Sequence, residues 1–259
     1  MSTPTITTTT RYAGLAGRTV LITGGATGIG ASLVAHFAAQ GCKVGFIDLA
    51  QEAGAELAAA LAAAAQAPVF VRADLTDTPA LQAAIARIRA QLGPITVLVN
   101  NAANDQRHSA DSVTPESWDA AIAVNLKHQF FAAQAVVGDM HAAGGGSIIN
   151  FGSVSWMLKM GGMPVYTTAK AAVQGLTRSL ARDFGPWRVR VNTLVPGWVM
   201  TERQQRLWFT ESSRQDIARG QCIDGLMMPE HIAPMALFLA SDDSAMCTAQ
   251  DFIVDGGWT

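Results

Sequence analysis

The sequence predicts an α/β fold: one doubly wound parallel sheet of about seven strands, with helices on both of its faces. Short apolar runs alternate along the chain with longer stretches of helical periodicity. Several runs are nearly continuous in Val, Ile and Leu, as strands buried on both faces of a parallel sheet should be. Right-handed helical crossovers between such strands give the doubly wound arrangement.

Seven apolar runs are predicted as strands, at residues 19–23, 43–48, 69–72, 95–100, 147–151, 188–194 and 252–254. The periodic segments between them are predicted as helices, near residues 29–40, 51–65, 77–92, 115–143, 165–184 and 229–240. The first strand ends at a glycine-rich turn. The second helix is rich in alanine, the strongest helix former. The stretches 115–143 and 165–184 are each expected to form one long helix.

A single domain is expected, because neither a Pro/Ser-rich linker nor a repeat of solenoid period divides the chain. Residues 1–12 are predicted to be a flexible N-terminal tail, and residues 13–259 the domain itself. Residues 199–228 interrupt the strand–helix alternation and carry Trp208 and Phe209. We interpret this insertion as a lid over a substrate. A packed pair of surface helices is the alternative.

Composition argues against several classes of function. The formal net charge is −2 and there is no basic block, so a nucleic-acid partner is not expected. The alanine-rich stretch 58–65 is too short to span a membrane, and the N-terminus lacks the pattern of a secretory signal. Three cysteines without a CxxC motif fit a reducing, cytoplasmic location. The histidine spacings give no reason to expect a metal site.

A glycine-rich turn follows the first predicted strand and opens a helix. Gly24, Gly28 and Gly30 allow a tight turn there, and they let backbone N–H groups approach a pyrophosphate at the helix N-terminus. Thr27 and Ile29 belong to the same loop. A glycine trio is weak evidence alone, but the strand before it and the helix after it indicate a Rossmann-type dinucleotide site.

Asp48 ends the second predicted strand, where a carboxylate can accept hydrogen bonds from the ribose hydroxyls of adenosine. It would repel a 2′-phosphate, and neither Leu49 nor Thr27 supplies a cation for one, so NAD is favoured over NADP as the cofactor. Asp74, after the third strand, is expected either to bond the adenine amino group or to cap the next helix.

Tyr166 and Lys170 lie four residues apart, which places them on one face of a helix. A phenol is a poor base at neutral pH, but a nearby ammonium favours its phenolate form. Tyr166 is therefore the candidate general base for alcohol oxidation, and general acid for carbonyl reduction. Ser153, thirteen residues before the tyrosine, is the candidate for orienting the reacting oxygen.

Taken together, these motifs resemble the short-chain dehydrogenase/reductase family over nearly the whole chain. The matching segments are Thr23–Gly30, Asp74-Leu75, Asn100 to Ala103, Asn125, Ser153, Tyr166 to Lys170 and Pro196 to Thr201. Where the family usually has glycine after the paired asparagines and alanine, this chain has Ala103. The resemblance implies that Asn125 anchors a proton-conducting water chain, that Lys170 also holds the nicotinamide ribose, and that the protein forms a homotetramer through the two long helices. It further implies cofactor contacts from Leu75, Asn101, Ala102, Pro196, Gly197, Val199 and Thr201.

A narrower resemblance is to bacterial NAD-dependent aldose 1-dehydrogenases, which oxidise sugars such as D-xylose or L-arabinose to lactones. It is carried by the segments from Asn100 to His108, from Ile149 to Trp156 and from Leu239 to Ser244, and by the ending Asp255-Gly-Gly-Trp-Thr. The candidate substrate contacts are Asn104, Asp105, Arg107, Ser153, Trp156 and Trp198. A salt bridge within the loop and core packing of the tryptophan are the alternatives. The alternative functions are a carbonyl reductase or polyol dehydrogenase, and a nucleotide-sensing protein without catalysis.

Overall fold

The computed structural model describes residues 4–6 and 10–259 and contains one seven-stranded sheet in the order β3-β2-β1-β4-β5-β6-β7. All neighbouring strands pair in parallel, which confirms the predicted fold class. The strands are β1 (Thr19–Thr23), β2 (Lys43–Asp48), β3 (Val69–Arg72), β4 (Ile95–Asn100), β5 (Gly146–Phe151), β6 (Val189–Pro196) and β7 (Asp251–Val254). The apolar central strands are buried as their composition predicts; every residue of β1 is buried.

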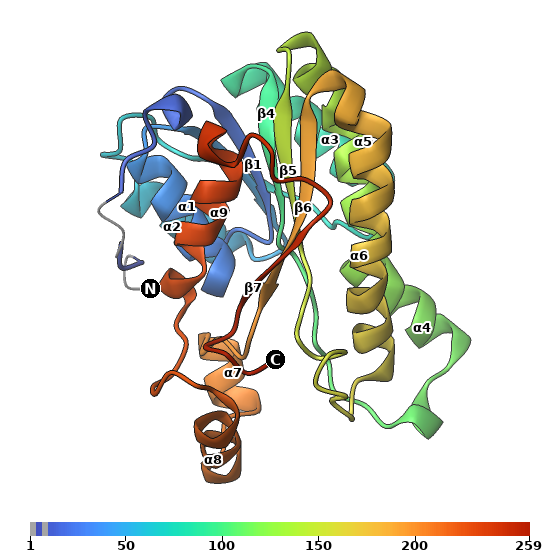
Figure 1. Cartoon of the computed structure of the whole chain (residues 1–259). Coiled ribbons are helices and arrows are strands. Elements are labelled where there is room, and N and C mark those ends of the chain that lie inside the picture. Colours follow the sequence, from blue (N-terminus) through green and yellow to red (C-terminus); the bar gives the residue numbers. More distant parts are fainter. Residues whose placement is uncertain (1–3, 7–9) are drawn as a thin grey trace.

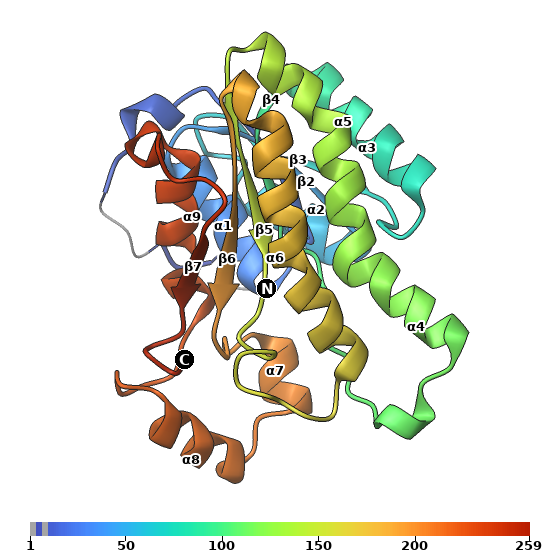
Figure 2. The same cartoon turned by 45° about the vertical axis from the view of Figure 1, so that its right-hand side comes forward.

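Helices cover the two faces of the sheet (Figures 1 and 2). On one face, α1 (Gly28–Ala39), α2 (Gln51–Ala60) and α9 (Ala233–Ala240) enclose one hydrophobic core, in which Phe37 and Phe46 are fully buried. On the other, α3 (Thr78–Leu92), α5 (His128–Ala142) and α6 (Pro164–Phe184) enclose the second core. The two cores hold the sheet rigid between them, so the loops at its carboxyl edge start from fixed positions.

The strand order reverses between β1 and β4, which are neighbours in the sheet although β2 and β3 separate them in the chain. Open parallel sheets bind ligands beside the carboxyl ends of their strands at such a reversal. The glycine-rich turn after β1 and the loop after β4 both begin there. Sequence and topology therefore place the predicted site residues at one edge of the sheet.

The predicted elements differ from the observed ones in three places. The helix expected over 115–143 is divided into α4 (Pro115–Ile122), a π-helical turn at Ala123–Lys127, and α5. The helix expected over 51–65 ends at Ala60. The helix expected over 229–240 begins with a short 3₁₀ turn at Pro229–His231. The division of the long helix is the functionally relevant difference, because it falls at Asn125.

The insertion after β6 forms α7 (Glu202–Leu207) and α8 (Glu211–Gly220), which lie beyond the carboxyl edge of the sheet (Figure 1). The C-terminal residues pack against this insertion. The indole of Trp258 lies so close to Gly220 that a Cβ on this glycine would be 2.1 Å from Nε1. Cys222 donates its backbone N–H to Gly256 O at 2.8 Å. This position fits the predicted lid, and lid function remains a proposal.

The N-terminal segment is only partly described. Residues 1–3 and 7–9 of the predicted tail lie outside the described residues. Tyr12 donates its backbone N–H to Gln40 Oε1 at 3.0 Å, and Gln40 Nε2 donates to Thr10 O at 2.9 Å, so this end of the tail contacts the end of α1. The domain boundary at residue 12 remains a prediction. Among the described residues, no helix is both long and apolar enough to cross a bilayer.

Candidate active site

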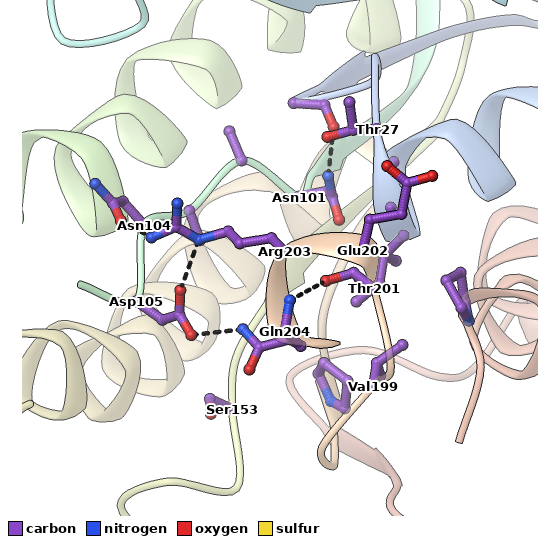
Figure 3. A pocket seen from close by; sticks show the side chains of 18 of the residues that line it. Thr27, Asn101, Asn104, Asp105, Ser153, Val199, Thr201, Glu202, Arg203 and Gln204 are labelled. Atoms are coloured by element: carbon purple, nitrogen blue, oxygen red, sulfur yellow. Dashed lines mark hydrogen bonds and ion pairs between the residues drawn. The ribbon is translucent and has the colours of Figure 1, made fainter. Parts of the chain in front are cut away.

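A cleft of about 1460 Å³ opens at the carboxyl edge of the sheet, and Figure 3 shows part of its lining. Of the residues predicted to hold the cofactor, all but Lys170 line it: Gly24, Thr27, Gly28, Ile29, Gly30, Asp48, Leu49, Asp74, Leu75, Asn101, Ala102, Tyr166, Pro196, Gly197, Val199 and Thr201. The predicted substrate contacts Asn104, Asp105, Arg107, Ser153 and Trp198 line it too. Asn125 and Trp156 are not among its lining residues. One cleft thus brings together residues that follow six of the strands, β1 to β6, and Tyr166 of α6.

The glycine loop is closed against its neighbours in a way that only glycine allows. Gly24 has a φ of 65°, and a Cβ on it would lie 2.7 Å from the Cα of Ala102. A Cβ on Gly30 would lie 1.8 Å from the carbonyl oxygen of Gly24. Asn101 fixes the loop from β4, since its Nδ2 donates to the carbonyls of Thr23 and Gly24 at 3.1 and 2.9 Å. The result is a narrow backbone cradle at the N-terminus of α1, which fits the pyrophosphate of a dinucleotide.

Asp48 both braces this cradle and faces the cleft. Its carboxylate accepts the N–H of Ala26 at 2.9 Å and that of Ala50 at 3.0 Å, which leaves further lone pairs for a ligand. Asp74 accepts both the N–H and the hydroxyl of Thr76, at 2.9 and 2.7 Å. The cap of α3 is Asp77, which accepts the N–H of Ala80. The alternative that Asp74 caps the next helix is therefore wrong.

Tyr166 and Ser153 meet in the cleft as predicted. Tyr166 lies in the first turn of α6, and Ser153 follows β5. The Ser153 hydroxyl is hydrogen-bonded to the phenol. Lys170, one turn further along α6, has its Nζ 5.7 Å from the centre of the Tyr166 ring. This Nζ is buried behind the cleft wall and donates to Phe151 O at 2.8 Å.

Burial works against the charged forms of both groups. It raises the pKa of Tyr166 to about 12, although the Ser153 hydrogen bond opposes the shift. Burial lowers the pKa of Lys170 to about 7. The sequence-based expectation that the lysine makes the phenol acidic thus misses the larger effect in the protein alone. When both groups are charged, a phenolate and a nearby ammonium stabilise each other.

Asn125 holds the loop after β4 rather than lining the cleft. Its Oδ1 accepts the N–H of Asn104 at 2.9 Å, and its Nδ2 donates to the carbonyls of Asn104 and Ala121 at 3.0 and 2.9 Å. The side chain is fully buried within the π-helical turn. Such turns often occur at functional sites, since they rearrange the regular ladder of backbone hydrogen bonds. Asn125 was expected within one continuous helix over 115–143, but it lies in the π-helical turn that divides this helix. Its contact with Asn104 was not predicted.

Two residues of the insertion after β6, which the sequence analysis did not single out, bind this loop. Arg203 donates from Nη2 to Asn104 Oδ1 at 3.0 Å and from Nε to Asp105 Oδ1 at 3.2 Å (Figure 3). Gln204 donates from Nε2 to Asp105 Oδ2 at 2.6 Å and accepts the indole N–H of Trp198 at 2.9 Å. Asp105 therefore does form a salt bridge, but with α7 rather than within its own loop as the alternative had it. Both residues lie in the segment predicted as a lid, but charge pattern alone could not identify their partners.

Trp156 is half-buried and its indole N–H has no hydrogen-bond partner among the described residues. Trp156 is not among the residues that line the cleft, and its contact with a substrate stays a prediction. Among the same residues, no group of three or more His, Cys, Asp or Glu side chains is arranged to hold a metal ion. Ser153 and Tyr166 line the same cleft as the glycine cradle, and Lys170 lies behind its wall.

Comparison with known proteins identifies the family. The family model described as "Enoyl-(Acyl carrier protein) reductase" matches residues 24–259. A mutant of a Serratia marcescens short-chain dehydrogenase/reductase superposes with a TM-score of 0.88 at 31% identity, and the match covers 95% of this chain and 99% of the other. The chain belongs to the short-chain dehydrogenase/reductase family. It is an oxidoreductase that acts on CH–OH groups. Dehydrogenases of this family use a nicotinamide cofactor.

Among curated proteins, this short-chain dehydrogenase/reductase is 48% identical to a Rhizobium meliloti protein named "Probable galactose dehydrogenase GalD", over 95% of this chain and 97% of that one. It is 47% identical to the D-xylose 1-dehydrogenase of Caulobacter vibrioides, over 95% and 98%. It is 35% identical to the D-threitol dehydrogenase of Mycolicibacterium smegmatis, over 95% and 94%. The two relatives with the higher identity are both named as sugar dehydrogenases, in line with the resemblance seen in the sequence.

Proposed function

We propose that the protein oxidises an aldose at C1 to the lactone, with NAD as the hydride acceptor. The observation that carries the proposal is the phenol of Tyr166, hydrogen-bonded to Ser153 in the same cleft as the glycine cradle. The similarity to two sugar dehydrogenases supports the substrate class. Bound NAD would supply the nicotinamide carbon that accepts the hydride from C1.

In this proposal each residue has one task. Tyr166 takes the proton of the C1 hydroxyl as general base, and Ser153 hydrogen-bonds the same oxygen and orients it. Lys170 stabilises the phenolate through its charge. Asn125 keeps the loop of Asn104 in place through its hydrogen bonds to that residue's backbone. The proposed water chain from Lys170 to Asn125, and a contact of Lys170 with the nicotinamide ribose, belong to the same hypothesis.

The experiment is a substrate panel with the purified protein. D-xylose, L-arabinose and D-galactose are incubated with NAD, and NADH is followed by its absorbance. Formation of NADH with stoichiometric lactone is expected. Absence of NADH with every aldose, together with turnover of threitol or of simple ketones, would replace the aldose proposal with the polyol or carbonyl alternative. The relationship to a D-threitol dehydrogenase makes this alternative worth including.

The preference for NAD rests on Asp48. We expect the substitution Asp48→Asn to lower the ratio of kcat/KM for NAD to that for NADP by about tenfold or more, because it removes a negative charge near the position of a 2′-phosphate. The measurement is initial-rate kinetics with both cofactors at fixed sugar. A ratio equal to that of the parent would show that Asp48 does not decide the cofactor. The melting temperature serves as the control, since Asp48 also accepts the N–H groups of Ala26 and Ala50.

A homotetramer is part of the proposal. Trp118 on α4 and Phe130 on α5 expose 40% and 39% of their surface, and such side chains support an interface along these helices. Sedimentation or light scattering of the purified protein gives the oligomeric state directly. A cytoplasmic location likewise remains a proposal, based on the cysteine content.

A further inference from the structure

The guanidinium of Arg107 lies between two indole rings. Its Cζ is 5.6 Å from the ring centre of Trp198, which follows β6, and 5.1 Å from that of Trp208, which follows α7. Arginine stacks on aromatic faces through both its charge and its planar group. Three segments of the chain thus meet at one side chain, and the two rings restrict the directions in which its N–H groups point.

Arg107 lacks the polar partners that such a group normally has. Its Nε is buried and has no hydrogen-bond partner among the described residues. The same residues provide it with no ion pair, since the carboxylate of nearby Asp105 is bound by Arg203 and Gln204. Buried polar groups are rarely left without a partner, and those that are call for an explanation such as an absent ligand.

The position of Arg107 makes the substrate the natural acceptor. Arg107 lines the same cleft as Ser153 and Tyr166. Burial is the largest effect on the pKa of Tyr166 and raises it; the Asp105 carboxylate raises this pKa further, and the Arg107 cation lowers it. A clamped guanidinium offers donors in a fixed fork, which suits oxygen acceptors on adjacent carbon atoms. An apolar alcohol would leave these donors without partners and would be discriminated against.

We propose that Arg107, clamped by Trp198 and Trp208, selects polyhydroxylated substrates by donating hydrogen bonds to sugar hydroxyls. This inference rests on the proposed oxidation of aldoses. Because Trp208 belongs to the proposed lid, the clamp also makes lid contact and substrate binding interdependent.

The test compares Arg107→Met and Arg107→Lys with the parent at saturating NAD. In Arg107→Met we expect KM for D-xylose and D-galactose to rise by about 10- to 100-fold, the range expected for hydrogen bonds to a charged group. We also expect the rise of kcat/KM with pH to shift to higher pH, because a cation near the phenol is lost. Arg107→Lys keeps the charge without the planar fork, so its KM should rise while its pH profile stays at that of the parent. Kd for NAD should be unchanged in both.

Arg214→Met is the matched control. Arg214 also lies over an aromatic ring of the lid, with its Cζ 5.6 Å from the centre of Phe209, but it does not line the cleft. The Arg214→Met variant should have the same KM and the same pH profile as the parent. If the parent oxidises aldoses and Arg107→Met keeps its KM and pH profile, the role of Arg107 is refuted while the proposed function stands. If Arg107→Met does not fold, Arg107→Lys decides, and an unchanged KM refutes the inference. If the parent oxidises no aldose, both proposals fall.

Discussion

The substitution Tyr166→Phe is expected to lower kcat for aldose oxidation by about 10²- to 10⁴-fold, the usual contribution of a general base. Phenylalanine keeps the ring and removes only the oxygen that is hydrogen-bonded to Ser153. Loss of the acceptor for the C1 proton should therefore affect the chemical step and leave the fold intact. Steady-state kinetics with D-xylose and D-galactose measure the effect.

The control for this variant is the binding of NAD and the melting temperature, both of which should match the parent. Ser153→Ala provides a second comparison, because it removes the partner of the phenol without removing the base itself. Its kcat should fall by less than that of Tyr166→Phe. A Tyr166→Phe variant that turns over at the parent rate would show that another group accepts the proton.

The substitution Gly30→Ala is expected to reduce kcat/KM for NAD by about 10²-fold or more, as displacements of about 1 Å in a binding site do. The added Cβ would lie 1.8 Å from the carbonyl oxygen of Gly24 and 2.9 Å from Nδ2 of Asn101, so the cradle must open. Binding of NAD measured by calorimetry should weaken in parallel.

Gly138→Ala is the matched control for a methyl group added to a helical glycine. Nothing lies within 4 Å of the position that its Cβ would occupy, and Gly138 is in α5, far along the chain from the cradle. Alanine in a helix interior stabilises by about 0.5–1 kcal/mol relative to glycine, so this variant should bind NAD as the parent does and melt slightly higher. Equal NAD binding by Gly30→Ala and Gly138→Ala would contradict the role of the cradle.

The sequence was sufficient to predict the sheet and the cofactor edge. Continuous apolar runs such as 95–100 leave little choice but a buried strand, and the glycines of the first turn lie where backbone approaches backbone. Local patterns could not predict the π-helical turn at Asn125, because a single turn is too short to be recognised as a separate period. One partner of this asparagine, Asn104, lies in a loop 21 residues away.

The burial and the contacts of the reacting groups could not be predicted from the sequence either. The spacing of Tyr166 and Lys170 shows that the two side chains share a helix face, but the pKa of the phenol depends on its burial, which is a property of the folded protein. The partners of Asp105 and Arg107 likewise come from α7 and from Trp198, about a hundred residues further on. Contacts of this range follow from tertiary packing alone.

The central claim, that the phenol of Tyr166 is the base, is tested most directly by the pH dependence of kcat/KM for aldose oxidation at saturating NAD. Only the phenolate accepts a proton, and burial raises the pKa of this group to about 12 in the protein alone. The account predicts a rise from neutral pH upward, by at most about tenfold per pH unit, that levels off at the pKa of the phenol in the complex. A profile that is flat from pH 7 upward would contradict it.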